Sequence, residues 1–262
     1  MSPPAPGVSH LLSQWDHVAA RVRAHSRVVI FLDFDGTLVA IAPRPELVRL
    51  TPAAREVLQR LARHPRATLV MISGRRRAQL LEHVGIRGIH YFGLYGWERS
   101  AASPLPARVS ATLRRARLQL ERHLRAYPSV WVEDKRSSFS VHLLDVPAAI
   151  QPRVRRQLRA WLKPFRRTLR AAENLRDVEV LPRSIPGKGL AVRRFLAQSA
   201  FRRAFPLYFG DDFSDESGFV AVRRGISVHV GKRRATRARY TVLDPAEVAA
   251  ALAKLETVLS ER

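Results

Sequence analysis

Short, almost entirely apolar runs recur along this chain, and each is bounded by glycine, aspartate or serine. The runs cover residues 27–33, 67–73, 89–94, 206–212 and 225–231. Continuous apolar character, rather than alternation, is typical of strands buried on both faces, as in a parallel sheet covered by helices. The pattern therefore predicts a parallel sheet with helices on its two faces.

Amphipathic helical segments lie between these runs. In residues 51–65, Thr51 is a candidate N-cap and Pro52 occupies the first helical position. A second segment, residues 75–85, ends at Gly85, a residue type that favours helix termination. Because strands and helices alternate, we expect a doubly wound, Rossmann-like α/β core.

The pattern changes between residues 106 and 184. This stretch has a basic helix and two strands, followed by a second helix and two more short strands. A repeated helix-strand-strand unit predicts a small α+β domain with an antiparallel sheet and a helical layer. Since buried strands resume at residues 206–212, we predict that 106–184 form an inserted cap in a core made of 1–105 and 185–262.

The charge balance is strongly basic, with a formal net charge of +24. Such a chain attracts small anionic substrates or polyanions by long-range steering that weakens with salt. Aromatic residues are sparse within the basic stretches, so base stacking has little support and we do not expect a nucleic-acid partner.

The chain contains no cysteine, which excludes disulfides and thiolate metal sites. Its first residues lack a signal-peptide pattern, and no run approaches the roughly 18 apolar residues of a membrane span. We therefore expect a cytoplasmic protein with no membrane partner.

Polar residues gather where the predicted strands end and where one helix begins. These residues are Asp33, Asp35, Ser73, Arg75, Lys188, Asp211, Asp212 and Asp215. In an open α/β sheet, ligands bind outside the carboxyl ends of the strands, so we expect these side chains to meet at one edge.

Such a set of side chains is suited to phosphoryl transfer. Crowded carboxylates repel one another unless a cation neutralises them, and Mg²⁺ prefers oxygen ligands of this kind. One aspartate can then attack phosphorus while a second carboxylate protonates the leaving oxygen and later activates water. In "DFDGT", the glycine at position 36 permits a sharp turn that brings Asp35 over Asp33.

These residues resemble the motifs of the haloacid dehalogenase superfamily of aspartate-dependent phosphatases. "DFDGT" resembles the first motif, Ser73 of "ISGR" the second, Lys188 the third and "GDDFSDE" the fourth. The resemblance implies that Asp33 is the nucleophile and Asp35 the general acid/base. It also implies that Mg²⁺ is held by Asp33, by the backbone carbonyl of Asp35 and by Asp211, with Asp212 or Asp215 assisting.

Within that superfamily the chain is most similar to trehalose-6-phosphate phosphatases. "FLDFDGTLVAIAPRPE", "SGR", "GLYGWE", "EDKRSSFSVH", "VEVLP", "GKG" and "YFGDDFSDE" have counterparts there in the same order. The resemblance implies hydrolysis of trehalose 6-phosphate, with Arg75 near the phosphate or the first sugar ring. The residues of the cap that it implies for sugar binding are Glu133, Lys135, His142 and Glu179. It also implies a functional association with a trehalose-phosphate synthase.

Some positions depart from the family pattern. Tyr95 stands where the family usually has a histidine. Leu144 or Leu143 stands where one arginine is common, and Leu181 where another is common. Two alternatives therefore stay open: a phosphatase for another glycosyl phosphate, of sucrose or mannosylglycerate type, and a catalytically retired basic binding or regulatory protein. Ser73 also has an alternative role as a helix N-cap.

Overall fold

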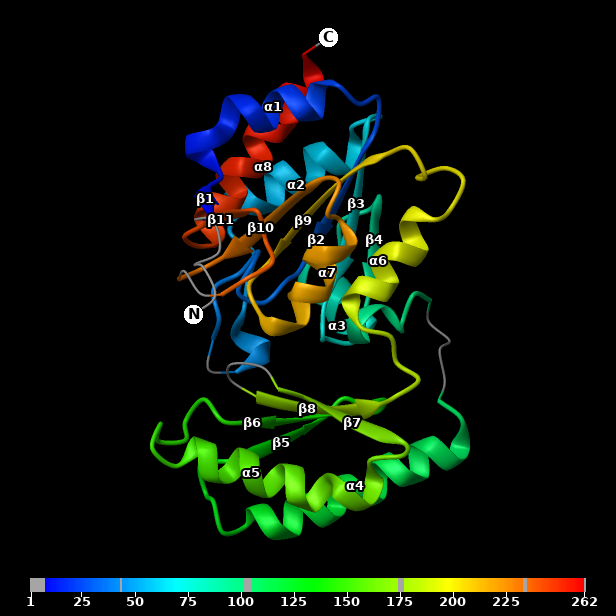
Figure 1. The fold of residues 1–262 in the computed structure, drawn as a ribbon, viewed down its shortest axis with the longest axis vertical. Helices are drawn as coiled ribbons and strands as arrows, with labels where there is room; N and C mark the ends of the chain where they lie inside the picture. The colour runs from blue at the N-terminus through cyan, green and yellow to red at the C-terminus, as the bar shows by residue number, and fades with distance from the viewer. Residues whose placement is uncertain (1–7, 43, 101–104, 174–176, 233–234, 262) are drawn as a thin grey trace, which may run out of the picture. The chain divides into compact units, whose positions relative to one another are not determined.

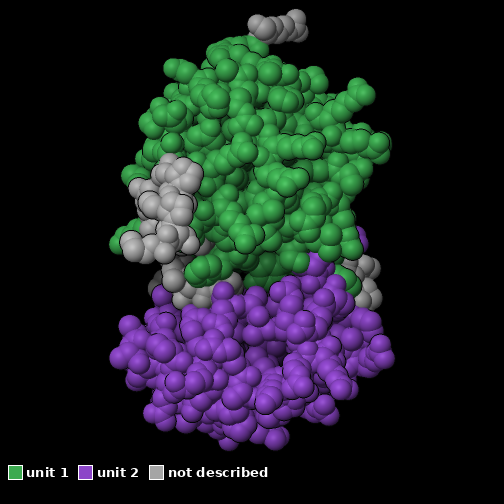
Figure 2. Space-filling model, in the orientation of Figure 1, with its two compact units in different colours: residues 1–99, 187–262 green, residues 100–186 purple. Residues whose placement is uncertain are grey.

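The chain forms two compact units in the computed structural model, which describes residues 8–42, 44–100, 105–173, 177–232 and 235–261. One unit, the core, comprises residues 1–99 with 187–262, and the other, the cap, comprises residues 100–186 (Figures 1 and 2). None of the helices in the described ranges combines the length and the apolar character needed to cross a membrane.

The core is built on one sheet. Its strands are β1 (Ser9–His10), β2 (Val28–Leu32), β3 (Ala67–Ile72), β4 (Ile89–Phe92), β9 (Phe205–Gly210), β10 (Ile226–Val230) and β11 (Tyr240–Val242). Their order in the sheet is β1-β11-β10-β9-β2-β3-β4, and the pairs are parallel. The predicted parallel α/β sheet is confirmed, and the short outer strands β1 and β11 are additions that the apolar runs did not predict.

Helices cover both faces of this sheet. They are α1 (Trp15–Arg23), α2 (Pro52–Arg63), α3 (Arg77–His83), α6 (Lys188–Leu196), α7 (Glu216–Ala221) and α8 (Pro245–Ser260), with single turns η1 (Leu12–Gln14), η2 (Pro45–Leu47), η3 (Leu94–Gly96) and η5 (Phe213–Asp215). Strand β2 shows how the two faces are filled. Its residues Ile30 and Leu32 belong to the apolar cluster that includes α1, α2 and α8, whereas Val29 and Phe31 belong to the cluster that includes α6 and α7. Side chains therefore alternate between two apolar layers, which explains the unbroken apolar run.

Two of the predicted helix signals are confirmed. Thr51 is the N-cap of α2, where its hydroxyl accepts a hydrogen bond from the Ala54 N–H at 3.2 Å, and Pro52 opens the helix. Gly85 follows the end of α3 with φ +60°, a left-handed conformation that favours glycine. The alternative role of Ser73 as N-cap is wrong, because α3 begins at Arg77 and residue 76 holds the cap position.

The cap is a two-layer α+β unit. Its elements are α4 (Ala107–Leu124), β5 (Trp131–Asp134), β6 (Phe139–His142), α5 (Gln151–Leu162), η4 (Lys163–Phe165), β7 (Leu169–Glu173) and β8 (Asp177–Pro182). The strands form an antiparallel sheet in the order β5-β6-β8-β7, and α4 and α5 cover one face of it (Figure 1). The predicted α+β insert with a helical layer is confirmed.

Alternation along the cap strands separates an apolar face from a polar face. Val141 of β6 and Val180 of β8 belong to the apolar cluster that includes α4 and α5. Ser140 and Glu179, which are paired across β6 and β8, point to the other face. The cap sheet therefore presents a row of polar side chains on the face that the helices leave uncovered.

Candidate active site

Asp33 lies directly after β2, at the carboxyl end of the central strand pair. Its N–H donates a hydrogen bond to the Phe209 carbonyl of β9 at 3.0 Å, so the parallel ladder holds the backbone beyond the strand itself. Gly36 then turns the chain with φ +80°, and a Cβ at this position would lie 2.0 Å from Oδ2 of Asp211. Glycine is therefore required here by both conformation and space.

Three carboxylates converge at this edge. Oxygen atoms of Asp33, Asp211 and Asp215 all lie within 4.8 Å of one another. Thr37, in the turn after Gly36, donates a hydrogen bond from its hydroxyl to Asp211 Oδ1 at 3.3 Å. Parallel neighbours β2 and β9 end side by side, which brings together groups that are far apart in the sequence.

Asp212 makes local contacts instead of joining this cluster. Its Oδ1 accepts a hydrogen bond from the Phe213 N–H at 2.6 Å, at the start of the single turn η5. Its own N–H donates to Asp215 Oδ2 at 3.1 Å. The structure thus groups Asp215, rather than Asp212, with the other two carboxylates, because the turn at 213–215 carries the later aspartate back toward β2.

Lys188 is buried between two of these carboxylates. Its Nζ lies 2.8 Å from Asp33 Oδ2 and 2.7 Å from Asp215 Oδ1, and the side chain is 1% exposed. Burial lowers the pKa of this ammonium, but the negative charges of Asp215 and Asp33 outweigh that effect and raise it overall. Lys188 therefore remains a fixed positive charge at the centre of the cluster.

The Tyr208 hydroxyl also contacts the cluster, which the sequence reasoning did not predict. It donates a hydrogen bond to Asp215 Oδ1 at 2.7 Å from within β9. Burial, reinforced by the charge of Asp215, raises the pKa of Tyr208 well above its usual value, so the hydroxyl keeps its proton. A tyrosine inside a wholly apolar run is the signal available in the sequence, because a buried hydroxyl needs a partner.

The carboxylate cluster has the donor chemistry of a divalent cation site. Burial raises the pKa of Asp33 well above its usual value, and the carboxylates of Asp215 and Asp211 raise it further, against the lowering effect of Lys188. One ammonium balances only part of the charge of three carboxylates. The residues therefore fit a hard cation with oxygen ligands, which would supply the missing positive charge.

Ser73 follows β3, and the strained turn at Leu94 and Tyr95 holds its backbone. Its Oγ accepts a hydrogen bond from the Arg75 N–H at 3.1 Å, and its carbonyl accepts one from the Tyr95 N–H at 2.9 Å. Leu94 and Tyr95 have φ values of +46° and +57°, which are uncommon for residues other than glycine. Such strained backbone persists where surrounding structure enforces it, here at the loop that positions Ser73 and Arg75.

Arg75 forms a two-point ion pair with Asp35, the second aspartate of "DFDGT". Its Nη2 donates to Asp35 Oδ1 at 2.6 Å and its Nε donates to Oδ2 at 2.7 Å. Nη1 donates to Nε2 of His83 at 3.1 Å, and the guanidinium carbon lies 5.3 Å from the Phe34 ring centroid. These two parallel hydrogen bonds fix the orientation of the Asp35 carboxylate.

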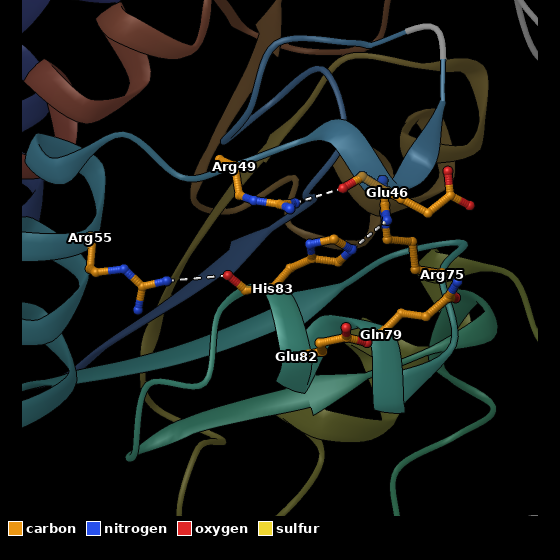
Figure 3. A pocket seen from close by; sticks show the side chains of 7 residues that line it. All are labelled: Glu46, Arg49, Arg55, Arg75, Gln79, Glu82 and His83. Atoms are coloured by element: carbon orange, nitrogen blue, oxygen red, sulfur yellow. Dashed lines mark hydrogen bonds between the residues drawn. The ribbon is translucent and has the colours of Figure 1, made fainter.

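A cavity of about 470 Å³ adjoins this pair in the core (Figure 3). Arg49, Arg55 and Arg75 line it together with His83, while Glu46 and Glu82 bring opposite charge to the same space. In Figure 3 the His83 ring points toward Arg75. Because arginines and glutamates both line the cavity, its walls carry charges of both signs.

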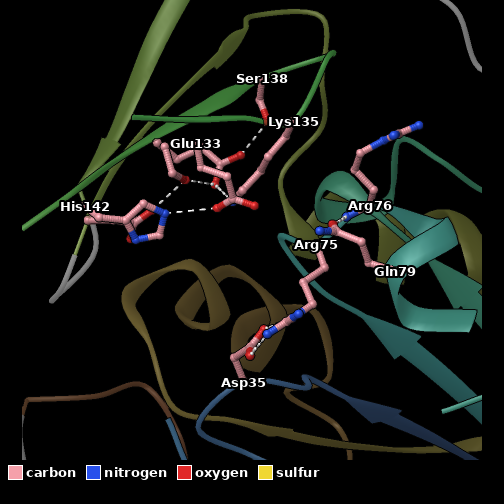
Figure 4. A network of polar contacts seen from close by, with 11 residues as sticks. Asp35, Arg75, Arg76, Gln79, Glu133, Lys135, Ser138 and His142 are labelled. Atoms are coloured by element: carbon pink, nitrogen blue, oxygen red, sulfur yellow. Dashed lines mark hydrogen bonds and ion pairs between the residues drawn. The ribbon is translucent and has the colours of Figure 1, made fainter. Parts of the chain in front are cut away.

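In the cap, two of the predicted sugar-binding residues satisfy one another. Lys135 Nζ lies 2.9 Å from Glu179 Oε2, and the Ser138 hydroxyl donates to Glu179 Oε1 at 2.6 Å (Figure 4). Glu179 is 1% exposed and Lys135 is 9% exposed. Burial lowers the pKa of Lys135, but the charges of Glu179 and Glu133 more than compensate and raise it overall.

The other two predicted cap residues form a more accessible group. His142 Nε2 lies 2.9 Å from Glu133 Oε2, and both side chains are partly exposed (Figure 4). The Trp131 ring stacks on the His142 ring with centroids 3.7 Å apart and 8° between the planes. The polar face of the cap sheet thus carries a carboxylate, an imidazole and an indole side by side at its β5 edge.

Comparison with known proteins places this geometry in a family. The family model for trehalose-phosphatase matches residues 31–246. This chain belongs to the trehalose-phosphatase family. The match includes the carboxylate cluster, Lys188 and the polar face of the cap.

Individual members of the trehalose-phosphatase family match along most of the chain. The trehalose-phosphate phosphatase of Mycobacterium tuberculosis is 32% identical over 88% of this chain and 62% of its own length. The corresponding Mycobacterium leprae protein is 30% identical over 98% of this chain and 62% of its own length. The chain thus spans about 62% of the length of the curated relatives it matches.

A solved structure agrees in fold. The C-terminal domain of the Candida albicans trehalose-6-phosphate phosphatase superposes with a TM-score of 0.82 at 18% identity. The alignment covers 96% of this chain and 98% of that one. It supports the arrangement of a parallel core sheet with an inserted antiparallel cap sheet.

Tyr95, one of the departures from the expected family pattern, lies close to the loop that follows β3. Tyr95 is 6% exposed, and a Cβ added at Gly74 would lie 3.0 Å from its hydroxyl oxygen. The phenol therefore packs against the loop that carries Ser73 and Arg75, and a Cβ at position 74 would make a tight contact with it.

Proposed function

We propose that this chain is a Mg²⁺-dependent phosphatase that hydrolyses trehalose 6-phosphate to trehalose and phosphate through an aspartyl-phosphate on Asp33. The observation that carries the proposal is the buried Asp33 carboxylate, held by Lys188 at 2.8 Å and clustered with Asp211 and Asp215. Asp35 follows two residues later as a second carboxylate. Membership of the trehalose-phosphatase family supports the choice of substrate.

In the first step, a carboxylate oxygen of Asp33 attacks phosphorus and the bond between phosphorus and the sugar oxygen breaks. Asp35 gives a proton to that oxygen, and neutral trehalose leaves. Lys188 and the Ser73 hydroxyl hold the other phosphoryl oxygens as charge shifts onto them. The product of this step is an acyl phosphate on Asp33.

In the second step, a water molecule attacks the phosphorus of the acyl phosphate. Asp35, now ionised, takes a proton from that water, and the bond between phosphorus and the Asp33 oxygen breaks. Phosphate leaves and both aspartates return to their initial protonation states. One carboxylate thus serves as acid and then as base, which requires that its position be controlled.

Mg²⁺ would be held by Asp33, Asp211 and the backbone carbonyl of Asp35, with Asp215 or Asp212 assisting. When bound, it would offset the charge of the carboxylates and of the substrate phosphate. The raised pKa of Asp33 supports this assignment, because a nucleophilic carboxylate must be ionised and the protein alone opposes ionisation.

The cap, residues 106–184 by the sequence boundaries, would recognise the sugar. Glu133 and His142 are the partly exposed pair, so we assign them direct contacts with hydroxyl groups. Lys135 and Glu179 already satisfy one another in a buried pair, and we assign them a supporting role under that surface. Arg75, bound to Asp35, would reach substrate phosphate only by exchanging one partner for another.

The deciding experiment is a phosphate-release screen over a panel of sugar phosphates, with and without Mg²⁺. We expect trehalose 6-phosphate to give the highest kcat/KM, and EDTA to abolish turnover. Asp33→Asn should remove activity on every substrate while the circular dichroism spectrum stays unchanged. Near-normal turnover by that variant would refute the nucleophile assignment.

The same screen tests two alternatives. Tyr95 stands where the resemblance leads us to expect a histidine, so sucrose and mannosylglycerate phosphates are kept in the panel. If no member of the panel releases phosphate, with or without Mg²⁺, the result would favour a binding protein that has lost catalytic activity. We also propose a functional association with a trehalose-phosphate synthase, which co-purification with that enzyme would test.

A further inference from the structure

A second cavity lies in the core at the amino-terminal ends of β2 and β9. Its volume is about 380 Å³, and its polar lining consists of Ser26, Arg27, Ser199, Arg202 and Arg203, with two alanines completing the wall. Residues 26–27 immediately precede β2, and residues 199–204 immediately precede β9. We call it the amino-edge cavity.

The amino-edge cavity is separate from the catalytic carboxylates. Strands β2 and β9 are parallel neighbours, so their amino ends meet at one edge of the sheet and their carboxyl ends at the other. Asp33 and Asp211 follow the carboxyl ends of these same strands. A ligand in the amino-edge cavity therefore occupies the opposite edge of the sheet from the proposed reaction.

Its charge is of one sign. Three guanidinium groups and two hydroxyls line it, and none of its lining residues in the described part of the chain carries a carboxylate. The cavity beside Asp35 differs in this respect, because Glu46 and Glu82 accompany its arginines. These side chains are exposed, and like charges that line one open cavity repel one another in the free protein. An anion that enters the cavity relieves this repulsion.

The polar side chains of this cavity also lack protein partners. Among the described residues, the side chains of Ser26, Arg27, Ser199, Arg202 and Arg203 make no hydrogen bond or ion pair. The backbone around them is nevertheless tied down, since the Phe205 N–H donates to the Arg27 carbonyl at 2.9 Å. These exposed donors are therefore free of protein partners, while the backbone segments that carry them are held together.

We propose that the amino-edge cavity binds a compact anion with two or more linked phosphate groups. Planar guanidinium forks match phosphate oxygens in two-point contacts, and three of them exceed what a single phosphate needs. The volume lies in the range of small-molecule sites. The anion is bound and not hydrolysed, because the lining holds no carboxylate or histidine to activate a nucleophile.

The test is calorimetric titration of inorganic tripolyphosphate into the full chain, without Mg²⁺ and at an ionic strength of about 0.15 M. Without metal, the catalytic carboxylates repel anions, which weakens binding at the catalytic edge; the variants below then separate the amino-edge cavity from the arginines of the other cavity. The variant Arg202→Gln with Arg203→Gln should bind at least about tenfold more weakly than the unchanged protein, since each guanidinium makes charged hydrogen bonds to phosphate.

The matched control is Arg166→Gln with Arg167→Gln, which removes the same charge from an exposed pair in the cap. We expect this control to bind tripolyphosphate as the unchanged protein does. A second variant, Ser26→Ala with Ser199→Ala, keeps the net charge and should weaken binding about threefold, because only hydrogen bonds are lost. Turnover of p-nitrophenyl phosphate should be unchanged in all of these proteins, so binding is tested independently of the proposed function.

Three outcomes would overturn the proposal. Equal weakening by the control pair would assign the effect to net charge alone. Unaltered affinity in the Arg202 and Arg203 variant would show that tripolyphosphate binds elsewhere. Tighter binding of a single-stranded RNA oligonucleotide, with the same dependence on these two arginines, would assign the surface to nucleic acid instead.

Discussion

Arg75 binds both carboxylate oxygens of Asp35, at 2.6 and 2.7 Å, across 40 residues of sequence. Arg75 is 7% exposed while Asp35 is 37% exposed, so a buried cation holds a carboxylate that faces the reaction space. His83 accepts a hydrogen bond from the same guanidinium at 3.1 Å. The proposed acid/base group is therefore oriented by a chain of contacts that begins on α3.

This relationship predicts that Arg75 controls turnover through Asp35. Arg75→Ala should lower kcat by ~100-fold, because a misplaced catalytic group costs roughly that factor. Arg75→Lys should recover only part of the loss, since an ammonium keeps the charge but not the two-point geometry. Steady-state kinetics on p-nitrophenyl phosphate would measure both. A rise in KM with unchanged kcat would instead indicate that Arg75 binds substrate.

Gly36 should not tolerate a side chain, because a Cβ at this position would collide with Asp211. A Cβ there would lie 2.0 Å from Asp211 Oδ2, so Gly36→Ala should displace that carboxylate, weaken Mg²⁺ binding and lower kcat/KM by ~100-fold. Gly231 has φ +106° with nothing within 4 Å of an added Cβ. Gly231→Ala should therefore show backbone strain alone, of ~1–3 kcal/mol, with normal activity. Equal kinetic damage in both variants would argue against a displaced Asp211.

The two pairs on the polar face of the cap should respond differently to mutation. Lys135→Met removes the buried ammonium that contacts Glu179, and we expect it to destabilise the protein by ~3 kcal/mol. Glu133→Ala, at a partly exposed position, should leave stability nearly unchanged and reduce turnover of trehalose 6-phosphate far more than turnover of p-nitrophenyl phosphate. Thermal unfolding and parallel kinetics on both substrates would distinguish these effects. Equal kinetic loss on the two substrates in Glu133→Ala would mean that the cap does not read the sugar.

His83 should make stability depend on pH below neutrality. Burial and then the positive charge of Arg75 lower the pKa of His83, so the folded state binds a proton less readily than the unfolded state does. Its stabilising contribution is therefore complete above the usual histidine pKa of about 6.5 and is lost progressively as the pH falls below that value. His83→Gln keeps an acceptor for Arg75 but does not titrate.

The quantity to measure is the difference in Tm between the unchanged protein and His83→Gln from pH 8 to pH 5, in order to cancel other titrating groups. We expect this difference to shift in favour of the variant as the pH falls through about 6.5. A constant difference across the range would show that His83 is not coupled to folding.

Much of the fold follows from local patterns in the sequence. Continuous apolar runs predict strands buried on both faces, and in β2 the residues Val29 and Ile30 do pack on opposite layers. Asp33 and Asp211 each follow directly after such a strand. Because parallel neighbouring strands end at a common edge of the sheet, the sequence also predicts that these two aspartates meet. Local rules suffice there because backbone periodicity and burial act over a few residues.

The partners of individual side chains were decided only by the tertiary structure. Sequence order alone favours Asp212 beside Asp211, whereas the turn at 213–215 brings Asp215 to Lys188 at 2.7 Å. Likewise, Arg75 contacts Asp35 and Lys135 contacts Glu179 across long stretches of chain. Such pairs depend on which strands become neighbours and on which charges burial forces together, and both are properties of the folded whole. The sequence by itself determined the class of fold and the acidic strand ends; the pairing of buried charges required the packed structure.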